Sequence, residues 1–502
     1  MKRRTIGLSL SYLNMALGMV FGLFLSSYLI QMLGDAEYGV YQTVTAFTNY
    51  LVLLEFGTGT VITRNIARCR AENREKDIEK NISTVLTITI GLIVLILIAS
   101  MAFYALFDGI YAKSMTAQQI VTGKRVLLLT VAYLVFSFAE QTIGGIILGF
   151  EQYAVRPLLS VIRLICRTAL LASLIFFFRC AEIIALIDAC ISLAALVFEI
   201  AYCARRLQIR FRFGSFDKQV LLFSLPLCVA LFIQTLVNQA NNNVDKFVIG
   251  VICNPESVTV YSVGLFFFNM FSSLTAAPIS MYGPQVVFDV SKGLSGEQIA
   301  DRLCAPSRMI VLLGGTVLFG FAAAGRQFIE LIYGPRFEQS WLIAIIIMTP
   351  MLINMSSGLL INILDACNKR MSRSWVLLAT TVGNIFLTVI WIRKNGMIGA
   401  AAATAICTLV GQDIVMNIYY HRVFGIRIFR MYFSFFRGIL PSQIIAGVAG
   451  YFVGKAIRGI LASFLASGCV YVAVFCILYY LWGMNDKERE QLQKVAKIVR
   501  KR

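Results

Sequence analysis

Long apolar runs, separated by short polar stretches, fill the sequence from end to end. Most runs reach about 20 residues, the length that a helix needs to cross the hydrocarbon core of a bilayer. Membrane-spanning strands would instead alternate apolar and polar residues over segments of about ten residues. The pattern therefore predicts an all-α polytopic membrane protein. We place fourteen spanning helices at residues 5–33, 38–63, 82–107, 125–149, 157–178, 182–204, 219–250, 258–284, 309–332, 340–365, 375–392, 396–420, 432–454 and 460–483.

The polar stretches between these runs alternate in charge along the chain. Most of the 45 lysine and arginine residues lie at the two ends of the chain and in every second loop, for example in 64–81 and 205–218. Cytoplasmic loops of membrane proteins carry such an excess of basic residues. The alternation predicts that both termini are cytoplasmic, which agrees with an even number of spans.

Composition excludes several other classes of protein. Hydrophobic residues make up 58% of the chain and charged residues only 14%, whereas soluble domains carry about 25% charged residues. The net charge of +19 lies in loops between spans, so it indicates membrane topology rather than a nucleic-acid partner. The single histidine, His421, argues against a zinc centre or a histidine-based triad. We predict no metal, no cofactor and no enzymatic activity.

Loops in the first half of the chain resemble loops that follow them in the second half, in the same order and at a similar separation in sequence. LGDAEYGVY (33–41) resembles ICNPESVTVY (252–261), and FDGIYAKS (107–114) resembles IYGPRFEQS (332–340). The repeat predicts two six-helix lobes in the same orientation, a design common among transporters, with two extra helices. The predicted organisation is an N-lobe at 1–204, a cytoplasmic linker at 205–218, a C-lobe at 219–420, helices 13 and 14 within 421–483, and a basic cytoplasmic tail at 484–502.

Several of the same loops carry a family likeness. LGDAEYGVY, LEFGTGTVITRNIA (54–67), NNNVDKFVIG (241–250) and GMIGAAAATAI (396–406) resemble the polysaccharide transporters of the MOP superfamily, and in particular the Wzx-type lipid-linked oligosaccharide flippases. The resemblance implies a two-lobed bundle with a central cavity in the bacterial cytoplasmic membrane. It also implies alternating access that moves undecaprenyl-diphosphate-linked glycans from the inner to the outer leaflet.

Basic residues inside the spans are the candidates for binding a diphosphate headgroup. Arg163 and Arg167 lie four residues apart on one helix face, and guanidinium groups bind phosphate oxygens while keeping their charge when desolvated. The alternative is that both arginines extend to the cytoplasmic interface beside Arg156. The full set of headgroup candidates is Arg163, Arg167, Asn241, Asn242 and Lys246.

Acidic residues inside the spans are the candidates for coupling or for lining the cavity, because charge within a bilayer is costly and faces a cavity or a partner. These candidates are Asp245, Glu55, Glu140, Asp188 and Asp413. Coupling by Na⁺, H⁺ or the membrane potential is left open. The alternative for each residue is a contact between helices.

Three functions are compared. The leading one is a lipid-linked glycan flippase, and the second is a multidrug or small-solute exporter of the same superfamily, which predicts an acidic, aromatic cavity. The third is a membrane glycan polymerase or ligase, which would need a large outward loop, whereas the longest predicted outer loop, 108–124, is short and poor in acidic groups. We expect a monomer that contacts membrane lipid, lipid-linked glycan and other polysaccharide-assembly proteins.

Overall fold

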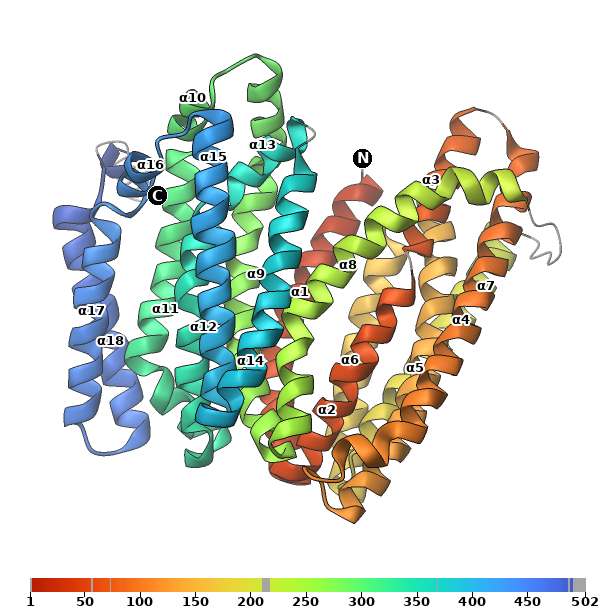
Figure 1. Ribbon diagram of the computed structural model, residues 1–502, viewed down its shortest axis with the longest axis horizontal. Coiled ribbons are helices and arrows are strands. Elements are labelled where there is room, and N and C mark those ends of the chain that lie inside the picture. Colours follow the sequence, from red (N-terminus) through yellow and green to blue (C-terminus); the bar gives the residue numbers. More distant parts are fainter. Residues whose placement is uncertain are drawn as a thin grey trace. The chain divides into compact units, whose positions relative to one another are not determined.

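The computed structural model describes residues 2–55, 57–72, 74–209, 217–367, 369–485 and 488–490. Within these ranges every regular element is a helix, as Figure 1 shows, which confirms the predicted all-α class. The chain forms two compact units, residues 1–259 and residues 260–502. The predicted division into lobes, linker and tail is a different division, and it stays a prediction.

The first unit is built from eight α-helices and a short 3₁₀ turn, and it also holds the first residues of α9. Its elements are α1 (Lys2–Leu33), α2 (Asp35–Leu51), η1 (Val52–Glu55), α3 (Thr58–Ala71), α4 (Glu75–Tyr111), α5 (Ala117–Gly149), α6 (Val155–Phe178), α7 (Glu182–Arg206) and α8 (Lys218–Ile252).

The second unit continues from α9 to the end of the chain. Its elements are α9 (Pro255–Ser291), α10 (Gly296–Arg302), α11 (Cys304–Tyr333), η2 (Pro335–Phe337), α12 (Glu338–Ser356), η3 (Gly358–Leu360), α13 (Ile361–Ala366), α14 (Arg370–Cys407), η4 (Thr408–Val415), α15 (Met416–Phe424), α16 (Ile428–Phe436), α17 (Ile439–Ala456), α18 (Ile460–Leu478) and η5 (Tyr479–Gly483). Two of these, η4 and η5, are π-helical.

Eleven stretches among the described residues are long and apolar enough to cross a membrane. The predicted span 38–63 is not among them because the 3₁₀ turn η1 and Gly57, with φ +65°, break it in two. The stretch Met371–Phe424 holds two predicted spans. The chain turns within it at Gly396, and Thr404 donates a hydrogen bond of 3.3 Å to Asn384, so the two halves lie side by side. The number fourteen and the cytoplasmic termini stay predictions.

Close helix packing organises the first unit. A side chain at Gly145 on α5 would overlap the carbonyl oxygen of Gly59 on α3, so the two backbones touch at this crossing. The hydroxyl groups of Thr58 and Thr142 lie 2.9 Å apart beside it. Small residues allow such close approach where lipid cannot drive helices together. The crossing holds α5 in place, and α5 supplies part of the site described below.

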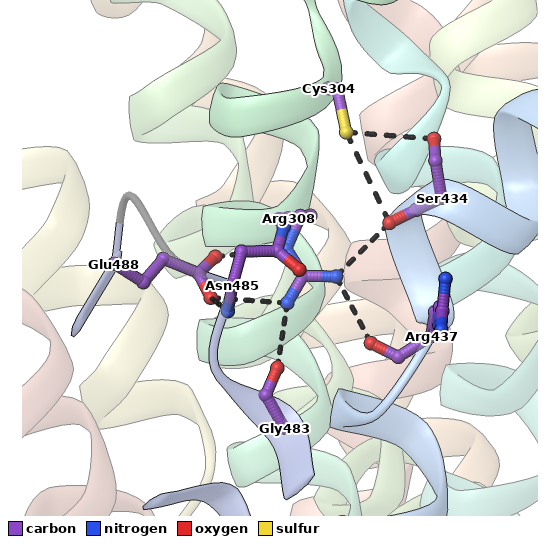
Figure 2. A network of polar contacts seen from close by, with 7 residues as sticks. All are labelled: Cys304, Arg308, Ser434, Arg437, Gly483, Asn485 and Glu488. Carbon is purple, nitrogen blue, oxygen red and sulfur yellow. Dashed lines mark hydrogen bonds and ion pairs between the residues drawn. The ribbon is translucent and has the colours of Figure 1, made fainter.

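One arginine connects several elements of the second unit (Figure 2). Arg308, near the start of α11, is only 2% exposed. Its guanidinium donates to the carbonyl oxygens of Ser434, Arg437 and Gly483 at 2.9–3.0 Å, and to both carboxylate oxygens of Glu488 at 2.8 and 3.1 Å. These bonds use all five guanidinium donors. They tie the residues before α17 and after α18 to α11.

Candidate functional site

Helix α6 carries three arginines on one face. Arg156, Arg163 and Arg167 are spaced seven and four residues apart, which places them in a line along a helix of 3.6 residues per turn. Large apolar side chains such as Ile162 and Phe177 are exposed elsewhere on α6, as expected for contact with lipid. The sequence therefore gives α6 one cationic face within an apolar helix.

The two arginines predicted to bind the headgroup are paired with two of the acids predicted for coupling. Arg163 donates to both carboxylate oxygens of Glu140 on α5 at 2.9 Å, and it also donates to the hydroxyl group of Ser192 on α7. Arg167 donates two hydrogen bonds, of 2.5 and 3.0 Å, to the two carboxylate oxygens of Asp188 on α7. Arg167 and Asp188 form a bidentate pair through two guanidinium nitrogens, whereas Arg163 reaches both oxygens of Glu140 through one nitrogen. Hydrogen bonds between charged groups are roughly twice as strong as those between neutral groups. The sequence indicated these four residues but not their pairing.

Arg156 is held less firmly. It donates a hydrogen bond of 2.9 Å to the amide oxygen of Gln141 on α5. Its Nε atom lies 3.5 Å from Glu199 on α7, but neither carboxylate oxygen of Glu199 has a hydrogen-bond partner among the described residues. A side chain at Gly144 would overlap the guanidinium of Arg156, so this glycine provides the space in which the arginine lies.

The three arginines are balanced by three carboxylates, and the arginines remain partly exposed. The exposed fractions of Arg156, Arg163 and Arg167 are 24%, 25% and 33%, whereas Glu199 is 1% exposed. Burying paired charge is costly unless the geometry is good, and burying unpaired charge is far more costly. Any anion that binds these arginines in place of the carboxylates must therefore leave the carboxylates without their partners.

Two cavities in the first unit adjoin these pairs. One, of about 300 Å³, is lined by residues of α1, α5, α6 and α7, including Asn14, Glu140, Arg156, Arg163 and Glu199. The other, of about 220 Å³, is lined by residues of α2, η1, α5 and α7. It contains Glu55, Asp188, Gln141, Tyr41 and Tyr133. The first cavity is bordered by both signs of charge, and the second by acidic and aromatic groups.

Residues predicted on the seventh span lie on α8 against α2. Lys246 donates a hydrogen bond of 3.4 Å to the amide oxygen of Gln42, and Asn49 donates one of 3.3 Å to Asn243. Asp245 is 4% exposed. These contacts join helices, as the alternative interpretation expects. The side chains of the two remaining candidates, Asn241 and Asn242, lie outside the described residues.

Asp413 belongs to the second unit, whereas the other described candidates belong to the first. It is 3% exposed, on the π-helical segment η4. One carboxylate oxygen accepts a hydrogen bond of 3.3 Å from Asn354 on α12, and the other has no hydrogen-bond partner among the described residues. The structure thus brings together Arg163, Arg167, Glu140 and Asp188, with Glu55 in the adjoining cavity, and it leaves Asp413 outside that group.

Glu199 is not among the residues predicted from the sequence, and Arg156 was expected in a loop. Glu199 lies within the predicted span 182–204, so the argument that selected Asp188 from the same span also applies to it. Arg156 lies one residue before the predicted span 157–178, but α6 begins at Val155 and includes it. Among the described residues no group of three or more metal-ligating side chains could hold a metal ion.

A family model described as "Polysaccharide biosynthesis protein" matches residues 5–284, which is more than half of the chain. No curated protein matches by sequence.

Two solved structures share the fold at low sequence identity. The structure titled "Lipid II flippase MurJ, inward closed conformation" superposes with a TM-score of 0.72 at 15% identity, covering 94% of this chain and 99% of that chain. An inward-facing multidrug resistance MATE family transporter of the MOP superfamily superposes with a TM-score of 0.61 at 13% identity, covering 86% of this chain and 99% of that chain.

These findings agree with the apolar helices and confirm the resemblance noted in the loops. The chain is a multi-pass membrane protein with the fold of solved flippases and transporters. It belongs to the polysaccharide biosynthesis protein family.

Proposed function

We propose that this protein moves undecaprenyl-diphosphate-linked oligosaccharide from the inner to the outer leaflet for surface polysaccharide assembly. The observation that carries the proposal is the line of three arginines on α6, partly exposed and beside a polar cavity within a membrane-spanning unit. The family itself is named for polysaccharide biosynthesis.

The chemistry of the substrate fits this site. A diphosphate diester carries two negative charges that must pass the hydrocarbon region, where an unpaired charge is very costly. Guanidinium groups bind phosphate oxygens in pairs and stay charged when they leave water. Glu140 and Asp188 occupy the places that phosphate oxygens would take on Arg163 and Arg167. The carboxylates keep the site neutral until the substrate replaces them.

Alternating access would then expose the loaded site first to one leaflet and then to the other. The proposal includes coupling of transport to H⁺, Na⁺ or the membrane potential. It also includes a monomeric protein whose partners are membrane lipid and other assembly proteins. Of the acids inside the spans, Glu55 and Asp188 line a cavity in the first unit, and Asp413 is buried with one unpartnered oxygen in the second.

A second candidate function is the export of a drug or another small cationic solute. The cavity of about 220 Å³ favours it, because Glu55, Asp188, Tyr41 and Tyr133 give that cavity acidic and aromatic walls. Aromatic faces and carboxylates bind organic cations. This cavity adjoins the α6 arginines through Asp188, so the two functions compete for one region of the unit.

The two functions are distinguished by deleting the gene and analysing lipid extracts by mass spectrometry. The flippase proposal expects undecaprenyl-diphosphate-linked glycan to accumulate, and the wild-type protein to clear it. The Arg163→Ala/Arg167→Ala protein should remain in the membrane without clearing it. A deletion strain with unchanged lipid-linked glycan and increased sensitivity to cationic drugs would overturn the flippase proposal in favour of export.

A further inference from the structure

Glu199 is a buried carboxylate at the proposed headgroup site that lacks hydrogen-bond partners among the described residues. Glu199 is 1% exposed and lines the cavity of about 300 Å³ between α1, α5, α6 and α7. Neither of its oxygens has a hydrogen-bond partner among the described residues, and the amide oxygen of Asn14, in the same cavity, also lacks one. This cavity thus contains buried acceptors without donors.

The charged groups around Glu199 come from two neighbouring helices. Helix α6 presents Arg156, at 3.5 Å, and Arg163, which is bonded to Glu140 of α5. From α1 the described lining contributes the neutral Asn14, and on α7 itself the thiol of Cys203 lies one turn further on. Arg156 is the closest positive charge to Glu199, and Gln141 already takes one of its donors.

Binding of an anion would remove the positive charge that balances Glu199 and Glu140. A diphosphate that draws Arg156 and Arg163 to its own oxygens removes the positive charge beside Glu199 and Glu140. A carboxylate left buried and unpaired is strongly destabilised unless it becomes neutral. Glu199 is the more deeply buried of the two, and apart from its ion pair with Arg156 it has no hydrogen-bond partner among the described residues that would keep it ionised. The carboxylate of Glu199 is therefore the group that must take up a proton.

We propose that Glu199 is a proton site linked to the headgroup site: it is ionised beside Arg156 when the site is empty, and it accepts one proton from water when a diphosphate takes Arg156. This inference rests on the proposed function. A diphosphate diester with two charges and one added proton still carries net negative charge. A membrane potential that is negative inside therefore favours its outward movement.

The test measures proton uptake when a diphosphate diester binds to the purified full-length protein in detergent. The probe is geranyl-diphospho-N-acetylglucosamine, whose diphosphate stays fully ionised at the assay pH, so any proton taken up belongs to the protein. Calorimetry in two buffers of different ionisation enthalpy gives the number of protons. The wild-type protein should take up about one proton per bound probe, and its affinity should fall about tenfold per pH unit as the pH rises.

Glu199→Gln places a neutral group of the same shape at the site, so the variant should bind without proton uptake and with an affinity that does not change with pH. Glu182→Gln is the matched control, because Glu182 lies at the other end of α7 and pairs with Arg125 of α5 at 3.8 Å. That variant should keep the wild-type proton uptake.

The results test the proton site and the diphosphate site separately. Proton uptake that is absent from the wild-type protein, or that persists in Glu199→Gln, would overturn the proton site while leaving the diphosphate site intact. A wild-type protein that does not bind the probe, at any pH, would overturn both the headgroup site and the linked proton. Loss of uptake in Glu199→Gln alone supports the inference.

Discussion

Each unit of the molecule places arginine within an apolar helix, Arg308 on α11 and Arg163 on α6, but the partners differ in kind. Arg308 is 2% exposed and gives three of its five hydrogen bonds to backbone carbonyl oxygens. Arg163 is 25% exposed, and among the described residues it bonds only to side chains, those of Glu140 and Ser192. A backbone carbonyl cannot turn away, whereas a carboxylate on a side chain can be replaced by another anion.

This difference indicates which arginines can exchange partners. Arg308 is saturated by groups that define the fold, so any ligand would have to unfold the ends of α17 and α18 to reach it (Figure 2). The α6 arginines adjoin a cavity, and their partners are acids that a phosphate can replace. A buried charge on an apolar helix is therefore not by itself a sign of function. The chemical type of the partners distinguishes a structural arginine from one available to substrate.

The largest effect is expected from Arg308→Ala. The change leaves Glu488 and three carbonyl oxygens without their donor, and breaking a buried pair in this way costs about 3–5 kcal/mol. We expect a large fall in melting temperature in detergent and little protein in the membrane. Arg437→Ala is the control, because it removes an exposed side chain and keeps the carbonyl that Arg308 binds. Equal melting temperatures for the two variants would contradict the structural role.

The next effect separates stability from transport at Arg163. Arg163→Gln leaves Glu140 buried and unpaired, at a cost of about 1–3 kcal/mol, and Glu140→Gln does the same to Arg163. The double variant removes both charges, so its free energy of unfolding should return to within about 1 kcal/mol of the wild-type value. If Arg163 binds substrate, transport stays lost in the double variant although stability returns. A double variant that clears lipid-linked glycan normally would show that the pair only supports the fold.

The sequence predicted the fold better than the site, for a physical reason. Apolar runs of bilayer length encode helices locally, so predicted spans such as 157–178 and 182–204 agree closely with α6 and α7. Kinks are harder to predict: Gly57 and the 3₁₀ turn η1 interrupt the predicted span 38–63 because of their backbone conformation.

The site depends on which helices are neighbours, and a single sequence does not specify this. Ionisable residues in apolar runs identified Arg163, Arg167, Glu140 and Asp188, but the pairing of these residues follows from the packing of α6 against α5 and α7. Arg308 was assigned to a loop because it lies one residue before the predicted span 309–332. Three of its partners are carbonyl oxygens, which any residue provides. Pairing with backbone leaves no pattern in the sequence.

A smaller effect is expected from Gly144→Ala, which acts on the weakest of the three arginine contacts. The added methyl group would displace the flexible guanidinium of Arg156 from Gln141 and Glu199. Stability should change little, because alanine favours a helix by about 1 kcal/mol over glycine and offsets the lost contacts. Transport should fall severalfold. Gly91→Ala on α4 is the matched control, since a side chain there meets no atom within 4 Å. Unchanged transport in Gly144→Ala would remove Arg156 from the site.

The smallest effect concerns the pH dependence of the Arg308 network. Burial alone would raise the pKa of Glu488, but the hydrogen bonds from Arg308 and from the backbone N–H of Asn485, together with the charge of Arg308, outweigh it and lower that pKa below its usual range. Glu488 is therefore ionised at lower pH in the folded protein than in the unfolded chain. Its contribution to stability is complete above the unfolded-state pKa, and it is lost as the pH falls through the folded-state pKa.

Glu488→Gln should accordingly lower the free energy of unfolding by about 1 kcal/mol at neutral pH, a modest amount because Glu488 is 26% exposed. The wild-type protein should lose this advantage on acidification, so that the melting curves of the two proteins converge at low pH. Glu338→Gln, which removes an ion pair exposed on both sides, is the control. A difference between Glu488→Gln and wild type that persists unchanged to low pH would mean that packing at this position, rather than the charge of Glu488, stabilises the ends of α17 and α18.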